Sequence, residues 1–120
     1  MSSTTTYECG HVVVVNVPFS TQTGSKPRPA VVVSTAAFHG PLLDVIVCPI
    51  SSQPRYSQRP GPGDVPLQRW KAVGLRHPSA ARVSNLFAVE KSLIKRVLGR
   101  LADDDLARLE GELRAALGLG

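Results

Sequence analysis

Lys26-Pro27-Arg28-Pro29-Ala30-Val31-Val32-Val33 is the stretch that decides the fold, because it leads a rigid cationic segment directly into a buried strand. Each proline fixes its own φ at about −65° and pushes the preceding residue out of the α region. Lys26 and Arg28 are therefore predicted to have extended backbones. The β-branched run that follows has the composition of a strand interior. Arg28 is thus predicted at the edge of a strand, with little freedom in the direction of its guanidinium.

An arginine in that setting has two readings. Its guanidinium carries five donors and keeps its charge at neutral pH, which suits a phosphate or carboxylate partner. The other reading is an exposed loop arginine without a ligand. This segment by itself does not choose between them.

Two further runs, Val12-Val13-Val14-Val15 and Val45-Ile46-Val47-Cys48, have the same β-branched composition and are bounded by polar residues, Gly or Pro. All three runs are continuous rather than alternating, so we expect the strands to be covered on both faces. A weaker strand is expected over residues 80–89. The pattern predicts a mainly β (α+β) fold, in which a small curled sheet or barrel carries a helix across one opening.

The other segments are predicted to be a loop and two helices. Residues 51–63 contain three prolines and two glycines, a density that excludes regular structure and predicts a long surface loop. Residues 90–98 are predicted to form a short helix. Asp103 is predicted to cap a longer C-terminal helix, whose leucines recur at helical spacing and pack on the core.

The length and the cysteines bound the class of protein. A chain of 120 residues can bury a single core without disulfides or a metal. Cys9 and Cys48 lie far apart without metal-ligand spacing, so neither a disulfide framework nor a zinc site is indicated, and a reducing cytoplasm is the expected location. We expect residues 1–9 to be a flexible tail and residues 10–120 a single domain. No apolar run approaches the roughly 20 residues of a membrane helix.

The positive charge is concentrated in one segment. The formal net charge is +5, and residues 51–82 alone hold six basic residues against one acidic residue. Basic and acidic residues balance in the rest of the chain. This distribution favours a polyanionic partner for the segment.

A second candidate cluster, Ser51-Ser52-Gln53, lies where the run at residues 45–48 opens into the cationic segment. Hydroxyl and amide groups at a strand end can hold a phosphodiester while nearby arginines neutralise it. RNA cleavage by the neighbouring 2′-hydroxyl also needs a proton acceptor and a proton donor. Ser-Ser-Gln is also a common opening of a loop, so both readings stay open.

Three histidines, His11, His39 and His77, are candidates for the acid and the base. The sequence pairs none of them, and a structural or solvent-facing role is the alternative for each. The chain lacks a GxSxG elbow, an HExxH motif and a Gly-rich loop followed by Lys and Ser or Thr. Acyl transfer, metalloprotease and nucleotide-hydrolase chemistry are therefore set aside.

These segments together resemble the MazF/PemK family of toxin–antitoxin ribonucleases, over residues 10–119. The motifs that carry the resemblance occur in the family's order: residues 10–19 with the first strand, residues 24–32 around Arg28, Pro49-Ile50-Ser51-Ser52-Gln53, residues 74–79, and Leu98-Gly99 with Leu101. The resemblance implies an SH3-like or CcdB-like β-barrel with a C-terminal α-helix, acting as a homodimer. It also implies an endoribonuclease without metal or cofactor that cuts single-stranded RNA, leaving 2′,3′-cyclic phosphate and 5′-hydroxyl ends.

The resemblance assigns two catalytic residues to this chain. Arg28 matches the arginine of the family's Arg-Pro motif and is implied to stabilise the phosphorane and to assist proton transfer. Ser51 stands where the family usually has threonine, and is implied to hydrogen-bond the scissile phosphate. RNA-binding roles are expected for Ser25, Lys26, Ser52, Gln53, Arg55, Tyr56 and Arg59. Trp70 and Phe87 are expected in the core.

The chain departs from the family at His11, which replaces a common aspartate, and in residues 20–25, which lack the acidic residue of some members. The family also implies an antitoxin with an acidic segment that binds the RNA groove. Two alternatives remain: a non-catalytic nucleic-acid-binding module, and a CcdB-like toxin that binds another protein.

Overall fold

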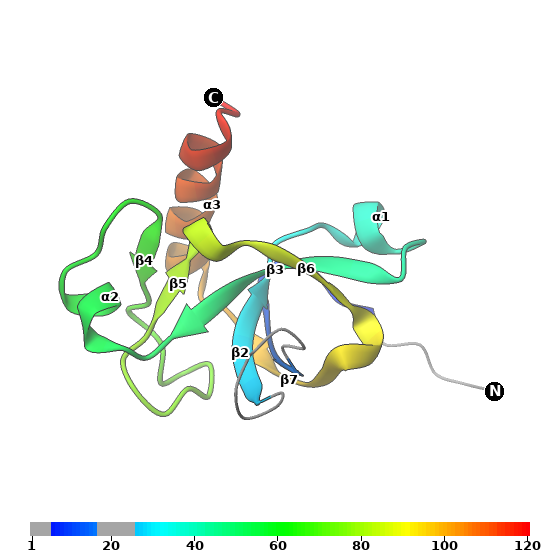
Figure 1. The fold of residues 1–120 in the computed structure, drawn as a ribbon, viewed down its shortest axis with the longest axis horizontal. Helices are drawn as coiled ribbons and strands as arrows, with labels where there is room; N and C mark the ends of the chain where they lie inside the picture. Colours follow the sequence, from blue (N-terminus) through cyan, green and yellow to red (C-terminus); the bar gives the residue numbers. More distant parts are fainter. Residues whose placement is uncertain (1–5, 17–25) are drawn as a thin grey trace.

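The computed structural model describes residues 6–16 and 26–120 (Figure 1). Its strands are β1 (His11–Asn16), β2 (Pro27–Val32), β3 (Asp44–Ser51), β4 (Asp64–Pro66), β5 (Ala80–Arg82), β6 (Phe87–Glu90) and β7 (Ile94–Arg100). Its helices are α1 (Ala36–His39), α2 (Pro54–Gln58) and α3 (Asp103–Leu117), with 3₁₀ turns η1 (Val83–Asn85) and η2 (Lys91–Leu93).

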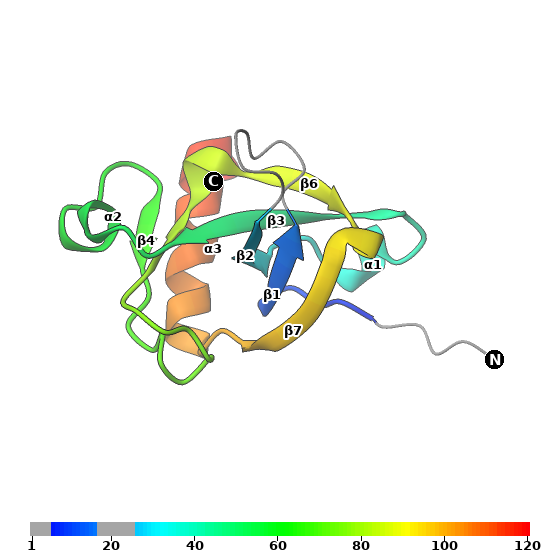
Figure 2. The same cartoon turned by 60° about the horizontal axis from the view of Figure 1, so that its bottom comes forward.

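The strands form one curled antiparallel sheet in the order β4-β5-β3-β2-β1-β7, and β6 also pairs with β3 (Figures 1 and 2). β3 is shared along its length: its first half pairs with β6 and its last two residues pair with β5. The predicted fold class, a mainly β sheet of barrel-like curvature with a C-terminal helix, is confirmed. The strand order is an open path rather than a closed ring.

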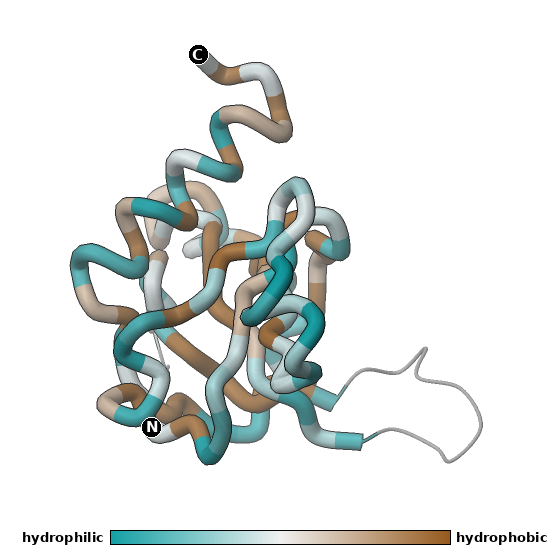
Figure 3. Tube along the Cα trace, turned by 90° about the vertical axis from the view of Figure 1, so that its left-hand side faces the viewer, coloured by the Kyte–Doolittle hydropathy of each residue, from teal (hydrophilic) through white to brown (hydrophobic). Residues whose placement is uncertain are grey.

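Two apolar clusters lie on opposite faces of β1, β2 and β3. The helix-side core contains Val12, Val31 and Cys48 together with Leu109 of α3. The inner core contains Val13, Val15, Ala30, Val32, Val45, Val47 and Val89. Successive residues of a strand point to opposite faces, so each valine run supplies both clusters. This explains the continuous runs and confirms that these strands are covered on both faces; hydrophobic stretches accordingly cross the middle of the molecule in Figure 3.

The segment at residues 51–63 corrects our expectation of a loop without regular structure, because it contains α2. Pro54 occupies the first turn of this helix, where a missing N–H costs nothing and the fixed φ fits. Pro60 follows Arg59, the residue that ends the helix. The prolines therefore bound a short helix instead of preventing one.

The helix predicted for residues 90–98 is also wrong, since most of this segment is β7. The pairing of β7 with β1 shifts register twice. These shifts allow apolar residues at helical spacing to be buried from a strand. Ile94 consequently packs on the inner core and Leu98 on the helix-side core. Pairing with the edge of β1 has overridden the local preference.

The weaker strand expected over residues 80–89 is present as two strands, β5 and β6, separated by η1. Both pair with β3, at Ile50↔Ala81 and at Val47↔Phe87. Five residues lie between Ala81 and Phe87, but only two lie between their β3 partners Ile50 and Val47, and η1 takes up the difference.

Asp103 begins α3, but it does not cap the helix. The N-cap residue is Ala102, which makes no side-chain cap bond. Asp103 to Asp105 still place negative charge in the first turn, where the helix dipole favours it. The expected capping role of Asp103 is therefore wrong, and the third carboxylate, that of Asp105, is buried.

Part of the segment expected to be a tail contacts the sheet. Tyr7 packs against the inner core, and its carbonyl bonds to His39 Nε2 at 2.6 Å. Glu8 forms an exposed ion pair with Arg100 at 3.1 Å. In the part of the chain that the structure describes, no helix has both the length and the apolar character to cross a membrane.

Candidate active site

A cleft of about 920 Å³ opens where β2, β3 and β5 end. Its polar and charged lining residues are Lys26, Arg28, Ser51, Ser52, Gln53, Tyr56, Arg76, His77, Ser79, Arg82, Asn85 and Arg96. Apolar residues of both cores, such as Ala30, Ile50 and Leu98, form its floor. The cleft brings together residues that are up to 84 positions apart, from Val14 to Leu98.

The sheet register places the two implied catalytic residues on neighbouring strands. β2 pairs with β3 at Ala30↔Pro49, and continuing this antiparallel register by two residues puts Arg28 level with Ser51. Both lie on the same face, since Arg28 is two residues from Ala30 and Ser51 is four from Val47, and these two belong to the inner core. Arg28 and Ser51 therefore line one cleft from adjacent strands.

Ser51 has a donor to spare. Its Oγ accepts a hydrogen bond from the backbone N–H of Gln53 at 3.2 Å. A hydroxyl has one donor and two acceptor sites, so this bond fixes the oxygen and leaves the O–H free to donate. Ser52 and Gln53 follow on the cleft wall, both exposed.

Lys26 and Arg28 also line the cleft, and both are exposed. Among the described residues, no acidic side chain forms an ion pair or hydrogen bond with either. Ser25, the neighbouring residue for which we expected RNA binding, lies outside the described residues.

Tyr56 of α2 faces the cleft between two arginines. The guanidinium of Arg82 lies 3.7 Å from the ring centroid and that of Arg55 lies 4.8 Å from it. Arg82 is itself held by Asp64, at 3.3 Å. Cation–π contacts of this kind attach α2 to β5. Arg55 and Arg59 are absent from the cleft lining, so only Tyr56 of the three α2-region candidates lies in the cleft.

The structure adds three charged residues that the sequence did not single out as site residues, Arg76, Arg82 and Arg96, and of the three candidate histidines it places His77 in the cleft. Arg76 and His77 belong to the segment at residues 74–79, one of the motifs that carry the resemblance. The motif at residues 74–79 is the sequence feature that could have indicated Arg76 and His77 as site residues. Arg96 had none, because its strand was expected to be a helix.

The electrostatic character of the cleft is one-sided. Its described lining holds five basic side chains and no aspartate or glutamate. The undescribed residues 17–25 contain no Asp, Glu or His. A cleft of this composition favours a polyanion.

Neither cysteine is a nucleophile in this structure. Burial raises the pKa of the Cys48 thiol to about 12, and burial together with the charge of Glu110 raises the pKa of Cys9. Both thiols are free and stay protonated at neutral pH. Over the described ranges, no three His, Cys, Asp or Glu side chains gather in a way that could hold a metal ion.

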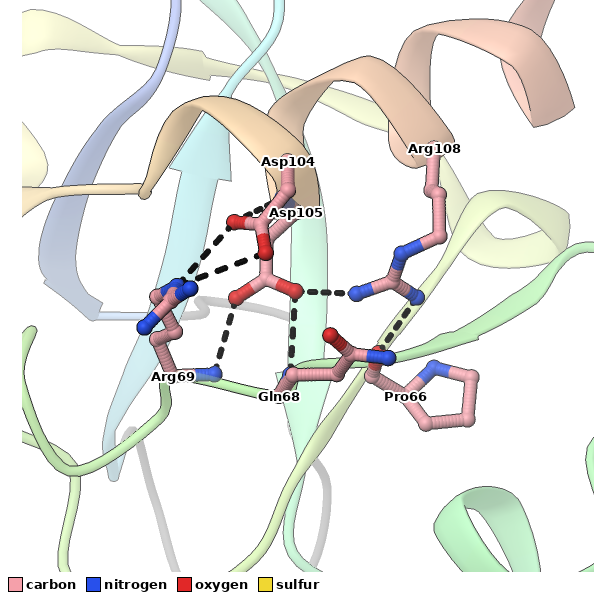
Figure 4. Close-up of polar contacts among 6 residues, drawn as sticks. All are labelled: Pro66, Gln68, Arg69, Asp104, Asp105 and Arg108. Carbon is pink, nitrogen blue, oxygen red and sulfur yellow. Dashed lines mark hydrogen bonds and ion pairs between the residues drawn. The ribbon is translucent and has the colours of Figure 1, made fainter.

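Asp105 fixes the segment that leads into the cleft (Figure 4). Its carboxylate is 1% exposed and accepts hydrogen bonds from the backbone N–H groups of Gln68 and Arg69, at 2.9 and 3.0 Å. Arg108 pairs with the same carboxylate and donates to the carbonyl of Pro66 at 2.9 Å. One turn of α3 therefore holds residues 66–69, which continue into the cleft-lining residues 74–79.

Arg69 also pairs with the exposed Asp104 at 3.3 Å. Desolvation acts to raise the pKa of Asp104, but hydrogen bonds from the Asp105 N–H and from Arg69 outweigh it, so that pKa is lowered. Two of the six basic residues in the segment 51–82, Arg69 and Arg82, therefore pair with carboxylates. The cleft residue Arg76 has no acidic partner among the described residues.

Comparisons with known proteins agree with this geometry. The sequence profile of the PemK-like, MazF-like toxins of type II toxin–antitoxin systems matches residues 8–117. A MazE–MazF crystal structure from Deinococcus radiodurans is similar at 27% identity and a TM-score of 0.75, over 95% of this chain and 98% of that one. A comparison with curated protein sequences finds no match.

Two mycobacterial structures share the fold. The Mycobacterium tuberculosis toxin MazF-mt6 is 22% identical, with a TM-score of 0.72 over 92% of this chain and 98% of that one. A mycobacterial endoribonuclease in complex with its cognate antitoxin is 17% identical, with a TM-score of 0.73 over 98% of each chain. With the profile covering most of the sequence, this chain belongs to the PemK-like, MazF-like toxin family of type II toxin–antitoxin systems.

Proposed function

We propose that this toxin is an endoribonuclease that cleaves single-stranded RNA without a metal ion, leaving a 2′,3′-cyclic phosphate and a 5′-hydroxyl. The observation that supports this most is the juxtaposition of Arg28 and Ser51 on one face of adjacent strands, in an acid-free cationic cleft. The cleft can accept the RNA backbone, whose phosphates dominate nucleic-acid affinity.

Arg28 and Ser51 have different proposed roles at the phosphate. Arg28, extended between two prolines, presents its donors to the oxygens that gain charge when the 2′-hydroxyl attacks. Ser51 donates its free O–H to a non-bridging oxygen and holds the phosphate in register. Lys26 and Arg76 neutralise flanking phosphates, and Ser52 and Gln53 position the backbone. Tyr56 offers an aromatic edge to a splayed base. Ser25, Arg55 and Arg59 are proposed as outer RNA contacts.

The same cleft is proposed as the landing site of an antitoxin. MazF from Deinococcus radiodurans and a mycobacterial endoribonuclease are both solved with antitoxins. An acidic antitoxin segment matches a cleft with five basic residues and would exclude RNA by occupying it. We propose that the toxin acts as a homodimer, as the family resemblance implies.

The test is to incubate the purified protein with a long mixed-sequence single-stranded RNA in excess chelator and to map the new ends. We expect cuts at a short recurring sequence, with 5′ ends that a kinase can phosphorylate directly. RNA that stays intact at equimolar protein contradicts the proposal. If that intact RNA is bound with a log–log salt slope of about −0.7 per phosphate contact, the protein is a binding module.

Ser51→Ala is expected to lower the cleavage rate by about 10–100-fold, because a hydrogen bond to a charged group contributes roughly 1.5–3 kcal/mol. Ser51→Thr is expected to keep the rate within a few-fold, since it restores the hydroxyl and restrains χ1. Single-turnover cleavage of one short RNA by the three proteins measures both. Equal activity of Ser51→Ala and wild type would remove Ser51 from the mechanism.

A further inference from the structure

The proposed reaction needs a proton donor that the two implied catalytic residues do not supply well. The 5′-oxygen leaves as an alkoxide unless it is protonated, and an arginine, which keeps its proton tightly, is a weak acid for that purpose. The titratable or charged side chains lining the cleft are Lys26, Arg28, Tyr56, Arg76, His77, Arg82 and Arg96. Within that lining, His77 is the one whose type titrates near neutral pH.

The cleft that contains the two candidate catalytic residues is also lined by His77. β3 pairs with β5 at Ser51↔Ala80, so the segment before Ala80 runs past the end of β3. Arg28, Ser51 and Ala80 stand level on three adjacent strands, and His77 reaches the cleft three residues before Ala80. The segment that carries His77 therefore enters the cleft from the β5 side of β3, whereas Arg28 enters it from β2 on the other side.

The backbone of His77 is held on both sides. Pro78 restricts it to extended conformations, and its carbonyl accepts a hydrogen bond from the buried Ser79 Oγ at 2.8 Å. The Ser79 carbonyl in turn accepts from the Leu67 N–H at 2.9 Å, next to the residues fixed by Asp105. The imidazole is exposed on this fixed backbone, which suits a group that must meet a substrate atom.

The other two histidines have structural partners. Both ring nitrogens of the buried His39 are engaged, by Ser34 Oγ at 2.7 Å and by the Tyr7 carbonyl at 2.6 Å. His11 Nδ1 accepts from the Glu8 N–H at 3.0 Å, and His11 is outside the cleft lining. The sequence offers no reason to prefer one of the three histidines as acid or base. In the structure, His77 is the one of the three that lines the cleft.

We propose that His77 is the general acid of the reaction, an inference that rests on the proposed ribonuclease function. The 2′-oxygen bonds to phosphorus, its proton passes to a water molecule, and the bond from phosphorus to the 5′-oxygen breaks. The electron pair of that bond stays on the 5′-oxygen, which takes the imidazolium proton of His77. Water returns a proton to the neutral imidazole after product release.

The acid role fits this cleft better than the base role. Arg28, Lys26, Arg76, Arg82 and Arg96 already favour the anionic attacking oxygen by their positive charge. The same charges stabilise the leaving 5′-oxygen but do not protonate it, so proton donation is the step that remains.

The test compares two RNA substrates that differ in one atom. In one the scissile 5′-oxygen is unmodified, and in the other it is replaced by sulfur, which leaves as a thiolate without protonation. Single-turnover rates are measured for wild type, His77→Gln and Arg76→Gln, with binding and thermal unfolding measured alongside. Arg76→Gln is the matched control, because it changes the adjacent cleft residue and removes a charge but no proton donor.

His77→Gln is expected to cleave the oxygen substrate about 100-fold more slowly than wild type and the sulfur substrate at a nearly equal rate. Arg76→Gln is expected to show the same, binding-derived deficit on both substrates. The wild-type rate on the oxygen substrate should also fall with rising pH as imidazolium is lost, and this basic limb should vanish in His77→Gln.

Two results overturn the assignment of His77 while leaving the ribonuclease proposal intact. One is a wild-type rate for His77→Gln on the oxygen substrate. The other is an undiminished deficit on the sulfur substrate, which would show a role other than proton donation. If the wild-type protein cleaves neither substrate while still binding RNA, the proposed function itself fails, and this inference fails with it.

Discussion

Arg28→Ala is expected to lower the single-turnover rate of RNA cleavage by about 10³-fold or more, with the fold intact. Removing one preorganised donor to a developing oxyanion typically costs about 10²–10³-fold, and here the variant also removes a full positive charge. The prolines on both sides keep the backbone extended in the variant. The measurement is the cleavage rate of a short RNA in chelator, followed by end mapping.

The matched control for this variant is Arg114→Ala, an exposed arginine of α3 that is outside the cleft lining. It removes the same net charge and should cleave like wild type. Arg28→Lys should recover only part of the rate, because an ammonium keeps the charge but loses the planar fork. Cleavage by Arg28→Ala at the wild-type rate would refute the assignment of Arg28.

Asp105→Ala is expected to lower the free energy of unfolding by about 2–5 kcal/mol, because each backbone N–H left without its acceptor costs about 1–3 kcal/mol, whereas the partly exposed Arg108 can be solvated. The variant leaves the N–H groups of Gln68 and Arg69 without an acceptor, and it removes the carboxylate that pairs with Arg108. Thermal unfolding should shift down by about 10–20 °C for a domain of this size. Chemical denaturation gives the free energy directly.

Asp103→Ala is the control, since Asp103 is an exposed carboxylate on the same helical turn that makes no cap bond. Its loss should cost only the interaction with the helix dipole, about 0.3–1 kcal/mol. Asp105→Asn, which keeps one acceptor oxygen, should fall between the two. If Asp105→Ala is no less stable than Asp103→Ala, the contacts in Figure 4 contribute nothing to folding.

Arg28→Ala and Asp105→Ala together distinguish a loss of catalysis from a loss of folding stability. Arg28→Ala should leave the unfolding curve unchanged and remove cleavage. Asp105→Ala should weaken cleavage through the segment at residues 66–79, while stability falls as well. Lowering the temperature until Asp105→Ala is fully folded should restore part of its rate, because its cleft residues are all present.

Local patterns in the sequence determined the three central strands, β1, β2 and β3, and the residues Arg28 and Ser51 on β2 and β3. The valine runs of β1, β2 and β3 are hydrophobic on both faces, so their burial between two cores follows from composition alone. The backbone of Arg28 follows from the prolines beside it, whose effect reaches only one residue. Ser51 was marked by its place at the end of a strand. Each of these features depends on neighbours in the chain.

Tertiary structure decided the features that depend on distant partners. β7 is a strand because β1 offers it an edge, although its apolar spacing looks helical. Asp105 serves residues 68 and 69, more than 30 positions away, where the sequence shows only an acidic first turn. His77 and Arg96 join Arg28 through strand register across the curled sheet. Pairing energy and burial between remote segments outweigh local preference, and no local pattern encodes where those segments meet.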